Sequence, residues 1–116
     1  MKNEKNRIVE LSLEFAIHIA LECKILHIKK EYNISNQLFR SGTSIGANIR
    51  ESQNSESKAD FIHKLKIAAK EAEETEYWLI ICQKTELISA DHELFEKLIQ
   101  IKKLLNAIIS TCYKNK

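Results

Sequence analysis

The chain contains no proline, and its 116 residues include only two glycines, Gly42 and Gly46. β-Sandwiches and barrels turn at short intervals, and those turns rely on Gly, Pro, Asn and Asp. A chain so poor in the first two is unsuited to an all-β fold. Helix formers such as Leu, Glu, Lys, Ala and Ile are abundant instead. We therefore expect an all-α protein, with one domain over residues 1–116, because this length suits one hydrophobic core.

The cysteines show no metal-binding or redox spacing. The three cysteines, Cys23, Cys82 and Cys112, form no CxxC pair, and an odd number cannot all pair within one chain. All three lie in stretches where apolar residues recur at helical spacing. We expect reduced, buried thiols, as is usual in a cytoplasmic protein.

The sequence also lacks an uninterrupted hydrophobic run. The stretch 8–26 is rich in aliphatic residues, but Glu10, Glu14, His18 and Glu22 recur through it every four residues. A lipid-spanning helix would not carry such a polar stripe. The first seven residues carry charges of both signs, and no cleavable apolar segment follows them. We expect a cytoplasmic protein with no membrane partner.

Apolar periodicity predicts four helices, at about 5–30, 35–53, 57–87 and from about 90 to the C-terminus. Ser35 is the expected N-cap of the second helix, and Ser57 with Asp60 resembles a capping box for the third. Ser89 or Asp91 is expected to cap the fourth. Long helices joined by short polar turns indicate an antiparallel up-down four-helix bundle. The main predicted core positions are Ile8, Leu11, Phe15, Ile19, Cys23, Leu26, Leu38, Gly42 or Ser41, Ile45, Ile49, Phe61, Leu65, Ala68, Ala72, Leu79, Cys82, Leu94, Leu98, Ile101, Leu105, Ile108 and Cys112.

The two glycines lie four residues apart in the second predicted helix, so they share one face. Glycine inside a helix is less favourable than alanine by about 1 kcal/mol. Two of them on one face predict that another helix packs very closely there. We assign Gly42 and Gly46 to helix close packing.

More apolar residues are present than one bundle core needs. The remaining ones are Val9, Leu13, Ile17, Leu21, Ile80, Ile99 and Ile109. They could enlarge the core and leave a few aliphatic side chains exposed. Alternatively, they could form a second seam between subunits of a homo-oligomer, which is the interpretation we favour.

Catalytic and metal-binding patterns are largely missing. A dinuclear carboxylate site in a bundle needs two Glu-x-x-His motifs, and only one near match exists, Asp60-x-x-His63. The segment 42–46 lacks the lysine of a phosphate-binding loop, since Ala47 follows it. No nucleophile is placed beside a base. We expect no enzyme activity, no catalytic residue, no cofactor and no metal. Surface or interface positions are expected for all four histidines, His18, His27, His63 and His92.

Basic residues cluster in and after the second predicted helix, although the net charge is only +2. Two of the three arginines, Arg40 and Arg50, lie here. The lysines that follow are Lys58, Lys64 and Lys66. These cations could simply pair with the nearby acids Glu51, Glu56 and Asp60. They could also form a surface that contacts nucleic-acid phosphates.

Two segments, 37–51 and 56–79, resemble the four-helix-bundle family encoded in intervening sequences of bacterial 23S rRNA genes. The most specific pieces are Arg-Ser-x-x-Ser-Ile-x-x-Asn-Ile at 40–49 and Ser-Lys-x-x-Phe at 57–61. Arg50 departs from the pattern, because relatives commonly have alanine there. The resemblance implies a four-helix bundle and a ring of five subunits with a central channel. It assigns no biochemical activity to most members.

The accessory protein of diversity-generating retroelements is similar in architecture, and it works as a basic pentamer alongside a reverse transcriptase and nucleic acid. Together with the arginine cluster, this similarity favours a non-catalytic homo-oligomer that binds structured RNA or a nucleoprotein. The expected contact residues are Arg40, Arg50, Lys58, Lys64 and Lys66. The alternatives are a protein-interaction scaffold with no nucleic-acid role and a bundle that holds a small molecule or metal. The sequence leaves open whether Arg40 and Asn48 lie in a subunit interface or on a ligand-facing surface.

Overall fold

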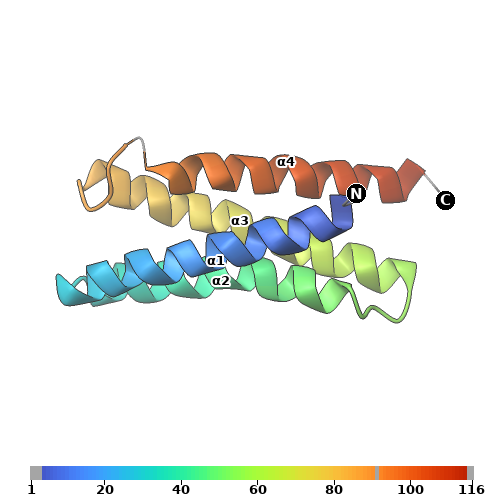
Figure 1. The fold of residues 1–116 in the computed structure, drawn as a ribbon, viewed down its shortest axis with the longest axis horizontal. Coiled ribbons are helices and arrows are strands. Elements are labelled where there is room, and N and C mark those ends of the chain that lie inside the picture. Colours follow the sequence, from blue (N-terminus) through green and yellow to red (C-terminus); the bar gives the residue numbers. More distant parts are fainter. Residues whose placement is uncertain (1–3, 91, 115–116) are drawn as a thin grey trace.

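The computed structural model describes residues 4–90 and 92–114, with side chains from residue 6 onward. Within these residues the chain forms four helices: α1 (Glu4–Ile28), α2 (Tyr32–Ser52), α3 (Lys58–Lys84) and α4 (Glu93–Lys114). Consecutive helices run in opposite directions along a bundle of 48 × 24 × 24 Å (Figure 1). Each helix packs against its neighbours in sequence, and α4 closes the bundle by packing on α1. The prediction of an all-α, up-down four-helix bundle is confirmed.

The core contains the residues that periodicity selects. Phe15 and Ile19 of α1 are fully buried, as are Leu38 of α2, Leu79 of α3 and Leu105 of α4. Three predicted core residues, Leu11, Phe61 and Cys112, are only partly buried. All three pack against the buried core while part of each residue still reaches solvent.

The three cysteines are free thiols, as predicted, but only Cys23 and Cys82 are buried. Burial is the main reason why the pKa of each of these two thiols rises to about 11. Both therefore stay protonated near neutral pH and are poor nucleophiles.

The second helix begins earlier than predicted, at Tyr32 instead of Ser35. Ser35 is buried inside α2, where its hydroxyl donates to the carbonyl of Cys23 at 3.0 Å. A serine that looks like a cap in the sequence therefore joins two helices. The turn between α1 and α2 is instead formed by the backbone at Lys30 and Glu31, where α1 ends.

Both α1 and α3 end in Schellman motifs without glycine. At the end of α1, Lys30 has φ 64°, its N–H donates to His27, and the N–H of Glu31 donates to Leu26 at 2.9 Å. Glu86, with φ 62°, occupies the same position after α3. Glycine usually fills this left-handed position. The helix ends at 30 and 87 were predicted too late because this signal is missing; α1 ends at Ile28 and α3 at Lys84.

Side chains cap the starts of α3 and α4. Ser57 accepts from the N–H of Asp60 at 3.0 Å, as predicted. Asp60 returns a bond to the N–H of Glu56 (3.3 Å), one residue earlier than in a standard capping box. At α4, His92 Nδ1 accepts from the N–H of Leu94 at 3.1 Å. Ser89 lies too far ahead of α4 to cap it, and Asp91 lies outside the described residues.

Gly42 and Gly46 lie where α2 packs against α1. A Cβ atom on Gly42 would stand 2.9 Å from two side-chain carbons of Ile19, which is fully buried. A Cβ atom on Gly46 would stand 3.2 Å from the backbone oxygen of Ser12. Neither neighbour can retreat easily, since one is a branched core side chain and the other is helix backbone.

Replacing Lys30 by glycine should stabilise the bundle. The substitution removes the steric strain of a left-handed lysine, against which the greater freedom of unfolded glycine counts only in part. We expect the free energy of unfolding to rise by about 0.5–1 kcal/mol, measured by urea denaturation at one fixed protein concentration. Lys29→Gly is the matched control, because φ is not positive there. A decrease with Lys30→Gly would contradict this account of the turn.

Gly42→Leu should destabilise the bundle by overpacking α1 against α2. The added side chain meets Ile19 in a filled core, so we expect a loss of about 1–3 kcal/mol in the same denaturation experiment. Ala107→Leu adds leucine at an exposed position of α4, and its effect should stay within about 0.5 kcal/mol. Equal effects at the two positions would show that helix packing at Gly42 has space to spare.

Candidate functional site

Arg40, the first of the five predicted nucleic-acid contacts, forms ion pairs between α2 and α3. Its guanidinium bonds to Glu74 and, at 3.3 Å, to Glu71. Glu74 also accepts from the indole N–H of Trp78 at 3.0 Å. The Trp78 bond, followed by the Arg40 bond, lowers the pKa of the Glu74 carboxyl below its usual value. Two carboxylates thus face the charge of Arg40, although its side chain remains 48% exposed.

The other four predicted contacts lie at the end of the bundle where α2 stops and α3 starts. Lys64 pairs with Glu51 at 3.2 Å. The ammonium group of Lys66 lies 5.0 Å from the centre of the Tyr113 ring on α4. Arg50 and Lys58 are exposed. Among the described residues, Arg50 has no ion-pair partner.

These cations face different sides of the bundle. Arg50 borders the groove between α1 and α2, beside Val9 and Thr43. Lys64 faces α2 through Glu51, and Lys66 faces α4 through Tyr113. The structure therefore gathers them around one end of the molecule and distributes them over several faces.

Of the apolar residues left over from the core, three form an exposed row on α1, whereas Ile80 and Ile99 are exposed on α3 and α4. Leu13, Ile17 and Leu21 are 48%, 53% and 57% exposed, and their spacing of four places them along one side of the helix. Beside this row runs a groove between α1 and α2. Its apolar lining includes Val9, Leu13, Ala16 and Ala47.

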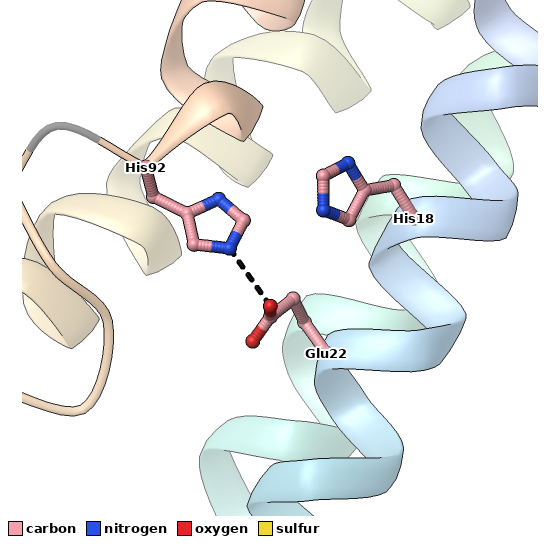
Figure 2. Close-up of side chains that lie close together, drawn as sticks. All are labelled: His18, Glu22 and His92. Carbon is pink, nitrogen blue, oxygen red and sulfur yellow. Dashed lines mark hydrogen bonds and ion pairs between the residues drawn. The ribbon is translucent and has the colours of Figure 1, made fainter.

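A third feature is a cluster of His18, Glu22 and His92, which sequence reasoning missed. His18 and Glu22 project from α1 toward His92, which lies immediately before α4 (Figure 2). His92 Nε2 lies 2.7 Å from Glu22 Oε1, and the two imidazole rings are 5.1 Å apart. All three side chains are partly buried. The spacing of His18 and Glu22 was visible in the sequence, but only the tertiary structure adds a residue 70 positions away.

Charged residues of α4 surround this cluster. Glu93 Oε1 lies 3.7 Å from His18 Nε2, and Lys97 Nζ lies 3.4 Å from His18 Nδ1. Burial, followed by the positive charge of Lys97, lowers the pKa of His18 below its ordinary value. A neutral His18 can accept at Nδ1 from the Lys97 ammonium. His18 and His92 were expected at surface or interface positions. In the structure both are partly buried and make contacts between α1 and the start of α4.

Residues 4–107 match the family described as 23S rRNA-intervening sequence protein. The chain belongs to this family. It is also similar to a crystal structure, at 1.70 Å resolution, of a protein with unknown function from the S23 ribosomal protein family of Bacteroides thetaiotaomicron VPI-5482. The two chains are 46% identical with a TM-score of 0.88, over 93% of this chain and 99% of the other. No curated protein matches this chain.

The family motif at 40–49 makes contacts inside the fold. Besides the ion pairs of Arg40, the hydroxyl of Ser41 accepts from Thr75 of α3 at 3.0 Å. The amide of Asn48 donates to the carbonyl of Ser44 within α2, at 2.9 Å. Arg40 and Ser41 therefore attach α2 to α3.

None of the described helices is apolar enough over a sufficient length to cross a membrane.

Proposed function

We propose that this member of the 23S rRNA-intervening sequence protein family works as a non-catalytic homo-oligomer. The observation that carries the proposal is the exposed row Leu13, Ile17 and Leu21 on α1. An ordered row of half-exposed aliphatic side chains is typical of a protein–protein interface. The family resemblance implies five subunits.

Burial of this row between subunits would stabilise an assembly. Apolar surface removed from water contributes roughly 25 cal/mol per Å². The adjoining groove between α1 and α2 adds Val9, Ala16 and Ala47, so the apolar surface is wider than one helix. Exposed Glu14 and Lys24 lie on the same helix and would supply a polar rim. A second copy of this chain suits such a surface better than a small ligand does, because the exposed row extends over two turns of α1.

Ile17→Lys tests the assembly surface. We expect the wild-type protein to sediment as an oligomer, at five times the chain mass of 13.4 kDa if the ring is pentameric. A lysine in the middle of the row should give a smaller species with unchanged helical circular dichroism. Ile80→Lys is the matched control: the sequence grouped Ile80 with the seam, but it lies on α3, outside the α1 row, and is 42% exposed. A monomeric wild type, or an Ile17→Lys variant that keeps the wild-type mass, would contradict the proposal.

Structured RNA is the partner we propose for the assembled protein. Arg50 supports this, since it is exposed and forms no ion pair among the described residues, and Lys58 is exposed nearby. Arg40 contributes less, because two carboxylates face it. A chain of net charge +2 repeated in a five-membered ring gives about +10, enough for a collective field.

Fluorescence anisotropy with a structured RNA at low and near-physiological salt tests this partner. The logarithm of affinity should fall linearly with log salt, by about 0.9 per phosphate contact for a duplex. Arg50→Ala combined with Lys58→Ala should flatten that slope. Lys84→Ala is the control, because Lys84 is exposed at the opposite end of α3. Absence of binding at low salt would overturn the RNA proposal and leave a scaffold whose partner is a protein.

A further inference from the structure

We propose that His18, Glu22 and His92 form a binding site for a divalent ion of the zinc class, where α1 meets the start of α4. One possible ligand atom from each of the three residues lies within 4.8 Å of the other two. Figure 2 shows the two imidazoles and the carboxylate facing one another across the space between α1 and α4.

The donor set selects the class of ion. Two imidazole nitrogens with one carboxylate oxygen suit Zn²⁺ and its first-row neighbours, whereas Mg²⁺ and Ca²⁺ prefer oxygen ligands alone. Glu93 follows His92 directly, and its Oε1 is 3.7 Å from His18 Nε2, so a rotation of this exposed side chain would bring a fourth ligand to the ion. Two carboxylates would then balance the charge of the ion, and the nearby ammonium of Lys97 can turn toward solvent.

The ligands need only a small rearrangement. Zn–N and Zn–O bonds of about 2.0–2.1 Å place tetrahedral ligand atoms roughly 3.3 Å apart. His18 and Glu22 are fixed on one face of α1 by their spacing of four. Glu22 Oε1 and His92 Nε2, now 2.7 Å apart, need to separate only slightly, and the His18 nitrogen closes from at most 4.8 Å. His92 precedes the first residue of α4, so its side chain moves at the expense of one capping bond, the bond from the N–H of Leu94.

The affinity for the ion is limited by hydrogen bonds that the three side chains already make, because the ion must replace them. His92 Nδ1 accepts from the N–H of Leu94, so the ring proton is on Nε2, which donates to Glu22 Oε1 at 2.7 Å. Coordination through Nε2 requires this proton on Nδ1 instead, so the bond to Glu22 and the bond from Leu94 are both lost. Lys97 likewise leaves His18 Nδ1. Because metal competes with these contacts, we expect micromolar dissociation constants, weaker than those of preformed structural zinc sites.

Calorimetric titration of untagged, chelator-treated protein with Zn²⁺ tests the site. We expect one equivalent per chain, and tetrahedral Co²⁺ should give visible absorption without a thiolate charge-transfer band. Glu22→Gln keeps a hydrogen-bond partner for His92 while removing the charged ligand, and it should weaken binding at least about tenfold. His92→Gln should do the same, and circular dichroism checks that both variants fold.

His63→Gln is the matched control, because His63 is an exposed histidine on α3, and binding should be unchanged. Three results would overturn the proposal. The first is that the wild-type protein shows no saturable Zn²⁺ binding in the micromolar range. The second is that wild type and Glu22→Gln bind Zn²⁺ with equal affinity. The third is a thiolate band in the Co²⁺ spectrum that disappears in Cys112→Ser. The last would assign the ion to cysteine.

Discussion

The close approach of α1 and α2 is the constraint on which the other features depend. Because Gly42 and Gly46 have no Cβ atom, the buried side chain of Ile19 packs directly against Gly42, and the backbone of Ser12 packs against Gly46. This contact fixes the rotation of α1 about its own axis. One side of α1 is then buried in the core, a second side exposes Leu13 to solvent, and on a third side His18 faces α4. A single helix thus supplies core, exposed apolar row and polar cluster.

Several charged residues of this bundle form ion pairs between neighbouring helices. Arg40 connects α2 to two carboxylates of α3, Lys64 returns from α3 to Glu51, and Lys102 connects α4 to Glu73 and Glu76 at 2.8 and 3.2 Å. Such partly exposed pairs stabilise only modestly, but they select one arrangement of helices. The same pairing explains why a basic sequence segment does not become one basic surface.

The junction between α1 and α4 differs from the rest of the bundle because its contacts are polar and titratable. His92 caps α4 with one ring nitrogen and meets Glu22 with the other. Through this one side chain, the start of α4 is tied to α1. The exposed apolar row lies on another side of α1, so assembly and events at this junction involve different residues.

The sequence by itself determined the four helices, most of their core positions and the cap at Ser57, because helical periodicity and capping are local signals. It misplaced the starts of α2 and α4, because Ser35 and Ser89 look like caps but do not cap these helices. It placed two helix ends too late, since Lys30 and Glu86 take positions normally marked by glycine. Which carboxylates meet Arg40, and which histidine meets Glu22, was decided only by tertiary structure. Those partners are 31–34 and 70 residues apart, and their meeting depends on how each helix is rotated against its neighbours.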